Sequence, residues 1–501
     1  MTRSPLLLPV VLPLLLTGAG WGEAAQEEET GKREEELFGE PGEPEPGVEE
    51  ADQNVKARQP ARREREREGS EGSEQGGTGT ERTEEGSELG LEEPVLTEGL
   101  VGSRLAESND RLVLGGQLYL RFHGSLDDDD GAPDELGLSS PTLLHLYLDG
   151  RPSDRLRAFA RGRLVHDATI AEGGETDELG RSRSRSEVFL DQLWLKFDIA
   201  RTVYVTAGRQ PIRWGSGRFW NPTDFLNQQR RDPLALLDER LGISLVKLHV
   251  PLESLGWNVY AVANFDEADS PADVGGAVRA EALVGPGEIA LSAAARKDQA
   301  TRLGADLSFG VGDFDLRLEG AVAHGEKKEF WRGSLDFAAT PTPYSREDDW
   351  IAQLTAGAEI AIRYSDEDNV VLGSEYFYND AGYGDATLYP WLAYQGDFTP
   401  FYLGRHYVSA YAALMSPGRW NDTSFIGSAI GNVSDGTWLA RLDYQVRVLT
   451  YLDLSAFAAV HLCDQGEFRF AVSIPPSDSF PQGLDIPAQR LDLGVWLTLR
   501  I

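Results

Sequence analysis

The sequence has little of what stabilises or anchors most proteins of its size. It contains a single cysteine, Cys463, so no disulfide can form within the chain. Beyond the N-terminus, no stretch reaches the roughly 18 apolar residues that a membrane-spanning helix requires. Helical periodicity is also scarce. Small secreted domains depend on disulfides, whereas a large sheet closed on itself does not, so these absences favour an all-β architecture.

The N-terminal 110 residues differ in composition from the rest. Residues 1–26 combine Arg3, the apolar core "PLLLPVVLPLLL" and small residues, which is the pattern of a secretory signal peptide; a buried hydrophobic helix is the alternative. Residues 23–100 hold 25 Asp and Glu against 9 Lys and Arg, nearly half of the net charge of −35. So few apolar residues cannot offset the entropy of ordering. We therefore expect residues 27–110 to be an acidic, disordered periplasmic segment; binding to a basic partner is the alternative.

What is present from residue 111 onward is an alternation of apolar and polar residues with a period of two. In "LDLGVWLTLRI" (491–501) one face is apolar, and the other carries Asp492 and Arg500. "RLDYQVRV" (441–448) and "FDLRLEG" (314–320) alternate in the same way, which indicates β-strands. A soluble β-sandwich also alternates, with its apolar face inward. The segments here are about ten residues long, the length of a tilted membrane-crossing strand, which favours a barrel.

Connections between the predicted strands are alternately short and long. Short turns at one rim, long loops at the other and an even strand count are typical of outer-membrane barrels. We therefore expect residues 111–501 to form a transmembrane, antiparallel, up-and-down β-barrel of about 18 strands, with 16 as the alternative, short periplasmic turns and long extracellular loops. The predicted strands are 112–124, 142–149, 155–166, 187–198, 202–213, 242–252, 256–265, 275–285, 288–296, 301–310, 314–324, 350–364, 369–378, 406–416, 423–432, 437–448, 450–463 and 489–501.

On this architecture, "GRQ" (208–210), "WG" (214–215) and "NPTD" (221–224) form a local pattern that resembles one found in proteobacterial outer-membrane barrels. Over residues 112–501 the chain resembles the outer-membrane porins and substrate-selective channels. The resemblance implies a bacterial outer-membrane location and passive or weakly selective diffusion of small hydrophilic solutes. It implies outer-membrane lipid and lipopolysaccharide as partners, the barrel-assembly machinery during biogenesis, and a homo-oligomer. No nucleic acid is expected.

In general porins the third extracellular loop folds back and narrows the pore. The corresponding loop here is 214–241, and "DPLALLDER" within it predicts a short helix, with Asp232 as N-cap and Pro233 at the first helical position. Pro211 cannot donate a ladder hydrogen bond, so we expect the preceding strand to end or bulge there. The candidates for the pore constriction are Arg213, Arg218, Asp224, Arg230, Arg231, Asp232, Asp238 and Arg240.

Strand alternation also predicts which charged residues face the lumen. Both signs are represented, and the row Arg157, Arg161 and Arg163 carries one sign, which favours anionic solutes. The lumen-lining candidates are Arg157, Arg161, Arg163, Asp315, Arg317, Glu319, Arg441, Asp443 and Arg447.

Other classes of function find less support in the sequence. The "GSG" at 215–217 lacks the Lys-Ser/Thr and the βαβ context of a phosphate-binding loop. The seven histidines are scattered and no serine motif accompanies them, so we expect no enzyme and no catalytic residues. Neither a cofactor nor a metal site is expected. A barrel that serves polymer export or envelope assembly is the alternative to solute diffusion.

Overall fold

The computed structural model describes residues 111–501 except 129–135, 177–181, 334–339, 366–367 and 475–483. The expected signal peptide (1–26) and acidic segment (27–110) therefore lie outside the described residues. Among the described residues, none of the helices has both the length and the apolar character needed to cross a bilayer.

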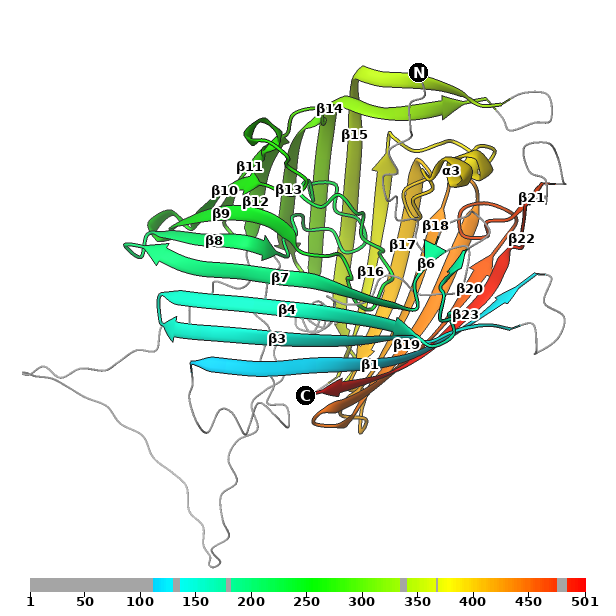
Figure 1. Cartoon of the computed structure of the whole chain (residues 1–501), viewed down its shortest axis with the longest axis horizontal. Helices are drawn as coiled ribbons and strands as arrows, with labels where there is room; N and C mark the ends of the chain where they lie inside the picture. Colours follow the sequence, from blue (N-terminus) through cyan, green and yellow to red (C-terminus); the bar gives the residue numbers. More distant parts are fainter. Residues whose placement is uncertain (1–110, 129–135, 177–181, 334–339, 366–367, 475–483) are drawn as a thin grey trace, which may run out of the picture.

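Eighteen strands of the described part of the chain form one antiparallel sheet that closes on itself (Figure 1). Each pairs with its neighbours in chain order, and β1 pairs with β23 to complete the ring. The predicted all-β barrel of 18 strands is confirmed. The strands are β1 (Leu112–Asp127), β3 (Pro141–Ser153), β4 (Leu156–Asp167), β7 (Ser186–Ile199), β8 (Val203–Gln210), β9 (Ile243–Leu252), β10 (Trp257–Asn264), β11 (Gly275–Val284), β12 (Gly287–Ala295), β13 (Thr301–Val311), β14 (Phe314–Arg332), β15 (Thr342–Arg363), β16 (Asn369–Asn379), β17 (His406–Met415), β18 (Thr423–Asn432), β19 (Thr437–Leu449), β20 (Leu452–Leu462) and β23 (Gln489–Arg500).

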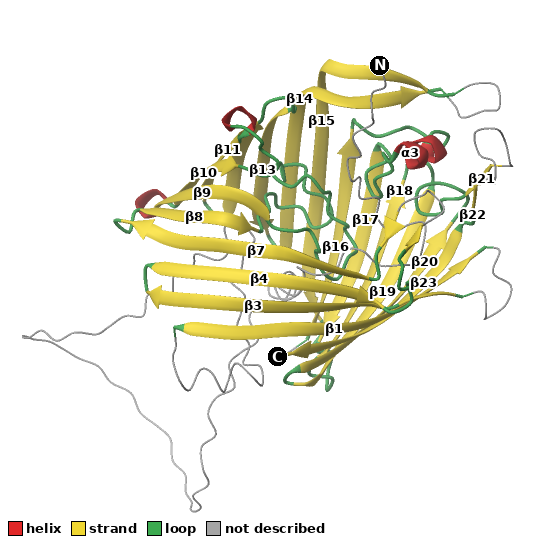
Figure 2. Ribbon diagram, viewed as in Figure 1, coloured by secondary structure: helices red, strands yellow, loops and turns green. Residues whose placement is uncertain are grey.

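Shorter elements decorate the rims. The strand β2 (Gly137–Ser139) continues the pairing of β3 with β1. The pairs β5 (Glu175–Thr176) with β6 (Ser182–Arg183) and β21 (Val472–Ile474) with β22 (Leu484–Ile486) lie in long loops, as does helix α3 (Tyr389–Gln395) (Figure 2). Two 3₁₀ turns, η3 (Glu253–Leu255) and η4 (Pro271–Asp273), connect neighbouring strands.

The two faces of the sheet are reversed relative to a soluble barrel. On β1 the apolar Leu120 and Phe122 are exposed, whereas Arg121 and His123 between them are buried. The same alternation runs around the ring, where leucines, valines and aromatics dominate the exposed large side chains. Exposure of so much apolar surface to water is unfavourable, whereas its contact with the hydrocarbon of a bilayer is favourable. In a bilayer the apolar face lies against lipid and the polar residues face the lumen.

One strand end agrees with the expectation from Pro211, and one segment departs from the sequence prediction. The strand β8 ends at Gln210, immediately before Pro211, as the missing N–H requires. The segment 325–349, expected to be a long loop, is instead largely strand, because β14 and β15 continue as a protruding hairpin (Figure 1). Pairing irregularities between His324 and Phe330 mark where this hairpin leaves the barrel wall. Trp331 near its tip packs against α3, so the hairpin is held by tertiary contacts that local alternation does not reveal.

Candidate functional site

The connection between β8 and β9, residues 211–242, lies inside the barrel, and we call it the strap (Figures 1 and 2). Phe219 and Trp220 pack with inward residues of β16–β20. Ile212 and Trp214 pack with residues of β9–β11 and β14, and Leu237 packs with residues of β1, β3 and β4. A segment that contacts separate arcs of the wall at the same time must cross the lumen.

The glycine-rich turn of the strap wraps around a carboxylate of the wall. Glu319 on β14 is buried, and its Oε2 accepts hydrogen bonds from the backbone N–H groups of Ser216 (3.0 Å) and Gly217 (3.1 Å). The N–H (2.6 Å) and hydroxyl (2.8 Å) of Thr223 donate to its Oε1. Gly215 has φ 106°, and a Cβ there would lie 2.5 Å from Oε1 of this carboxylate. Glycine is therefore required for the close approach.

The next three residues of the strap enclose a second carboxylate. Backbone N–H groups of Arg218 (2.7 Å), Phe219 (3.1 Å) and Trp220 (2.9 Å) donate to buried Glu375 on β16. Successive amides that converge in this way form an anion-binding nest, the device that phosphate-binding loops use. Here the barrel wall itself supplies the anion. A buried carboxylate is costly when unpaired, so these donors both satisfy the wall and fix the strap.

A third wall carboxylate binds the strap through a side chain. Glu359 on β15 accepts from Nη2 of Arg218 at 3.1 Å and from Nη1 of Arg317 at 3.2 Å. The Tyr411 hydroxyl of β17 also donates to it. Glu319, Glu359 and Glu375 lie on three consecutive strands, and we call this part of the lumen surface the carboxylate wall.

Aromatic packing reinforces these hydrogen bonds. Trp220 stacks on Phe377 with ring centres 5.3 Å apart and lies 5.6 Å from Tyr407. Its indole N–H donates to the carbonyl oxygen of Phe401 at 3.1 Å. Burial of an aromatic ring of this size stabilises the packed state by a few kcal/mol. The "RFW" at 218–220 therefore acts as an anchor.

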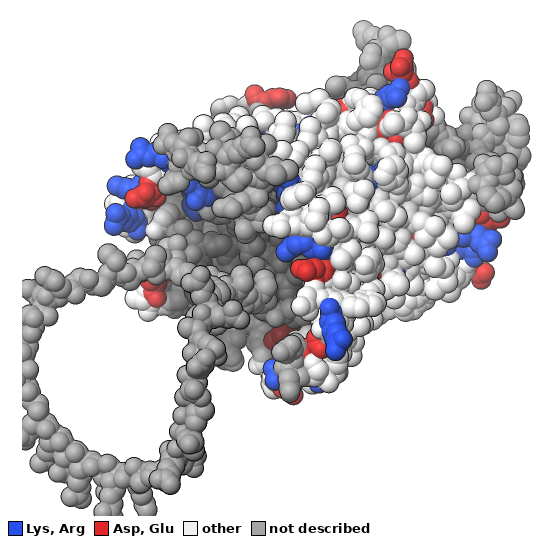
Figure 3. Space-filling model, turned by 90° about the horizontal axis from the view of Figure 1, so that it is seen from below, with Lys and Arg blue, Asp and Glu red and all other residues white. Residues whose placement is uncertain are grey.

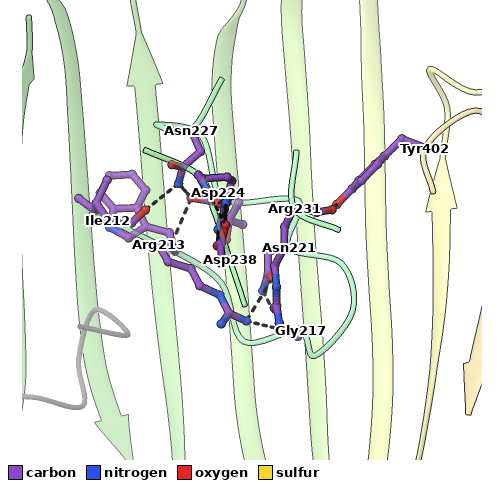
Figure 4. A network of polar contacts seen from close by, with 12 residues as sticks. Ile212, Arg213, Gly217, Asn221, Asp224, Asn227, Arg231, Asp238 and Tyr402 are labelled. Carbon is purple, nitrogen blue, oxygen red and sulfur yellow. Dashed lines mark hydrogen bonds and ion pairs between the residues drawn. The ribbon is translucent and has the colours of Figure 1, made fainter. Parts of the chain in front are cut away.

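Charged residues of the strap also contact one another (Figure 4). Arg240 pairs with Asp224 through Nη1 at 2.8 Å and with Asp238 through Nε at 2.8 Å. Nη1 of Arg231 donates to the carbonyl oxygen of Arg218 at 3.1 Å, and Nη2 of Arg213 donates to that of Gly217 at 3.3 Å. The strap is thus cross-linked to itself as well as to the wall.

These contacts shift the pKa values of the paired groups. Burial alone would raise the pKa of Asp238, but the charge and hydrogen bonds of Arg240 lower it to about 2. Burial would likewise lower the pKa of Arg240, but the charges of Asp238 and Asp224 raise it above its usual range. For Arg213, burial and the nearby charges of Arg231 and Arg240 lower the pKa well below the usual range. The Asp238–Arg240 pair is therefore ionised over all ordinary pH values.

The remaining constriction candidates lie at different depths. Asp232 is partly exposed, and its Oδ1 accepts from the N–H of Leu234 at 2.8 Å. The helix predicted from "DPLALLDER" does not form, and this stretch consists of turns. The capping signals are local, whereas tertiary contacts hold this stretch: Leu234 and Leu237 pack with residues of the wall, and Glu239 pairs with Arg121. Arg230 is exposed on the strap, and its guanidinium lies 5.4 Å from the centre of the Tyr402 ring.

The opposite arc of the lumen surface, on β1 and β4, carries arginines, and we call it the arginine wall: Arg121, Arg157, Arg161 and Arg163. All four are buried on the lumen side. Arg121 pairs with Glu239 of the strap at 3.1 Å, and Nη1 of Arg163 donates to the carbonyl oxygen of the same residue at 2.7 Å. These two contacts tie the end of the strap to this wall.

Carboxylates from neighbouring strands partly compensate the positive charge of these arginines. Arg161 and Arg163 pair with Asp191 of β7 at 2.7 and 3.2 Å. Arg157 pairs with Asp149 of β3 at 2.8 Å. The row therefore does not present the uncompensated positive charge that its sequence suggests, because strand pairing places acidic residues directly beside it.

The other lumen-lining candidates are less closely connected with the strap. Arg441 pairs with Asp443 on β19 at 2.7 Å and lies 3.9 Å from the centre of the Phe457 ring. Arg447 is exposed near the short-turn rim and pairs with Asp453 at 3.3 Å. Asp315 is exposed near the same rim. The structure thus brings Arg317 and Glu319 to the strap and leaves Asp315 apart.

Sequence reasoning missed Glu359 and Glu375. Both occupy inward positions of alternating strands, in "GAEIAIR" (357–363) and "GSEYFYN" (373–379), so a single acidic residue among apolar ones was the available signal. Their partners in the strap lie about 140–157 residues away in the chain. No local pattern indicates such a contact.

No protein-family model matches the chain, and no curated protein matches it either. Solved structures of outer-membrane proteins are similar in fold. OccK9 (OpdG) of Pseudomonas aeruginosa is 11% identical, with 81% of this chain and 100% of that chain covered and a TM-score of 0.48. OccAB1 of Acinetobacter baumannii is 11% identical over 78% and 96%, with a TM-score of 0.47. OprB of Pseudomonas putida is 11% identical over 80% and 97%, with a TM-score of 0.45. The barrel assignment rests on the strand pairing of the chain itself.

Proposed function

We propose that this protein is a channel of the bacterial outer membrane through which small hydrophilic solutes diffuse passively or with weak selectivity. The reversed surface supports the location, because an apolar exterior around a polar interior suits a bilayer. A barrel of 18 strands is wide enough to leave a water-filled passage beside a single internal loop. The strap narrows this passage.

The observation that carries the proposal is the attachment of the strap to two separate arcs of the lumen. Glu375 holds its first half through three backbone amides, and Arg121 holds its last residues through Glu239. A loop fixed at both ends reduces the cross-section and sets the charges that a solute meets. In a narrow, water-poor passage those charges act more strongly than in bulk water.

A cavity of about 310 Å³ lies on the long-loop side of the strap. Its lining includes Phe225 and Arg230 of the strap, Arg302 of β13, and Tyr402 of the loop after α3. A solute that enters from this rim reaches this cavity before the strap. The mixture of rings, amides and charges suits small polar solutes better than apolar ones.

The test is single-channel recording of the purified full chain in planar bilayers. A diffusion channel gives discrete conductance steps that scale with salt concentration. Absence of steps at any salt concentration, with correctly folded protein in the bilayer, would contradict the proposal. A barrel for polymer export would instead give large openings only when its strap or rim loops are removed.

A further inference from the structure

A cavity of about 480 Å³ lies at the short-turn rim, between the β3–β4 turn, the ends of β7 and the start of β8. No residue of the strap or of the carboxylate wall lines it. Cationic residues dominate its lining: Arg111, Arg151, Arg155, Arg157 and Lys196. We call these five the rim cations.

The carboxylates nearby do not balance this charge. Asp154 and Asp198 also line the cavity, and Arg155 pairs with the latter at 2.7 Å. Behind the lining, buried Asp149 pairs with Arg151 at 3.0 Å and with Arg157 at 2.8 Å. Among the described residues around this cavity, five cationic side chains thus accompany three carboxylates. Arg151 and Arg155 are themselves about half exposed, and ion pairs of exposed side chains contribute little, so these two guanidinium groups remain able to bind further anions.

Three other short turns of the same rim have the opposite character. The turn after β9 contains Glu253, the turn after β13 contains Asp313, and the turn after β15 contains Asp368. Figure 3 shows Lys and Arg side chains clustered at the left of the view, the end at which Figure 1 places the β3–β4 and β7–β8 turns. The positive charge is therefore local to one sector of an otherwise acidic chain.

We propose that this sector is the docking surface for the acidic N-terminal segment of the same chain. The segment, residues 27–110, ends directly before Arg111, which lines the cavity. Residues 91–110, directly before it, carry five carboxylates and one arginine. Twelve residues separate Glu98 from Arg111, and an extended chain covers about 3.3 Å per residue, so the segment is long enough for its carboxylates to reach the exposed rim cations.

Covalent attachment makes such weak contacts effective. A short tether holds the segment near its site at an effective concentration on the order of millimolar, so individually weak ion pairs are occupied together. Because these pairs are at the surface, salt screens them, with a Debye length of about 10 Å at 0.1 M. Docking is thus expected to be intramolecular, to involve several carboxylates and to weaken as salt rises.

The scarcity of lysine provides a direct test. Lys196 is the one lysine that lines this cavity, and the other lysines of the described residues lie elsewhere. Treatment of the full chain in detergent micelles with a zero-length carbodiimide couples amines to carboxylates in contact. Mass spectrometry is expected to find Lys196 joined to glutamates of residues 81–110. The yield is expected to fall severalfold between 50 mM and 500 mM salt, both values chosen to bracket the screening range.

Two double variants separate docking at the rim cations from a general electrostatic attraction between the acidic segment and any cation of the barrel. Arg151→Gln with Arg155→Gln removes two exposed rim cations and is expected to lower the yield severalfold at low salt. Lys297→Gln with Lys327→Gln removes two exposed cations of the long-loop rim and is expected to leave it unchanged. No coupling of Lys196 to the segment, coupling that salt and the first double variant do not affect, or coupling only between two copies in a mixture of isotope-labelled and unlabelled protein would each overturn the proposal.

Discussion

The buried charged side chains of the carboxylate wall and of the arginine wall find their partners in different parts of the chain. On the carboxylate wall, Glu319 and Glu375 find their donors in the backbone of the strap, which is remote in the chain. On the arginine wall, Arg157 and Arg161 donate to carboxylates of adjacent strands. Removal of the strap would leave the carboxylates of the carboxylate wall without these hydrogen-bond donors, whereas most ion pairs of the arginine wall would remain.

This difference assigns separate roles to the two walls. The carboxylate wall depends on the strap, so its residues decide whether the strap stays in place. The arginine wall has few contacts with the strap, namely those of Arg121 and Arg163 with Glu239 and of the partner carboxylate Asp191 with the N–H of Gly242, so its residues act chiefly on the charge that a solute meets. Substitutions on the carboxylate wall are expected to change conductance, and substitutions on the arginine wall are expected to change ion preference.

The largest effect is expected for Trp220→Ala, at the anchor on the carboxylate side. Loss of a buried indole costs about 3–5 kcal/mol of local stability, and the strap then opens frequently. Hydrogen exchange of the amides of residues 216–223 measures that opening. Trp438→Ala, which removes an exposed indole from the outer face, is the matched control and leaves exchange of the strap unchanged. Equal exchange in both variants would show that the anchor does not hold the strap.

Glu375→Gln removes the negative charge that the nest of backbone amides binds, and it keeps the shape of the side chain. An amide retains one acceptor oxygen but turns its NH₂ group toward a backbone donor, so we expect a loss of about 3 kcal/mol. The amides of Arg218, Phe219 and Trp220 should exchange faster than those near Glu319. Asp315→Asn, on an exposed position of β14, is the control. Protection that is unaltered in Glu375→Gln would argue against the nest.

The Asp238–Arg240 pair predicts how the strap responds to acid. The pKa of Asp238 is lowered from 3.8 to about 2, so its stabilisation is complete above pH 3.8 and is lost as the pH falls through 2. The contribution of this pair to protection of the strap, taken as the difference between the native chain and Asp238→Asn and corrected for intrinsic exchange, should stay constant from pH 7 to pH 4 and decline below. Asp238→Asn should lower protection by about 2 kcal/mol at neutral pH and abolish the decline. A decline centred near pH 6 would assign the response to another group.

The smallest effect is expected on the arginine wall. Asp191→Asn leaves Arg161 and Arg163 without their shared carboxylate, so the lumen gains positive charge. The reversal potential in a salt gradient should move by a few millivolts toward anion preference, with conductance nearly unchanged. Arg161→Gln should move it in the opposite direction. A large change of conductance in either variant would mean that this wall also holds the strap.

The sequence predicted the barrel well and the strap only in part. The alternation of apolar and polar residues predicted all eighteen strands, because the part of each strand that crosses the bilayer must present an apolar face to lipid. Local rules also placed the end of β8 before Pro211, since that residue lacks an N–H. The charged residues of 214–241 were found, but their partners were not. Glu375 comes to the strap only through closure of the barrel, and Asp191 beside the arginines follows from strand register, which alternation within one strand does not reveal.

The central claim is that the strap crosses and narrows the lumen, and excision tests it most directly. Residues Ser216–Asp238 would be replaced by a short Gly-Ser linker, and the single-channel conductance would be compared with that of the full chain under the same salt and voltage. The account predicts a severalfold rise in conductance together with a weaker ion preference, because the narrowest and most charged section is gone. Unchanged conductance and unchanged ion preference in a correctly folded barrel would show that the strap does not obstruct the path of the solute.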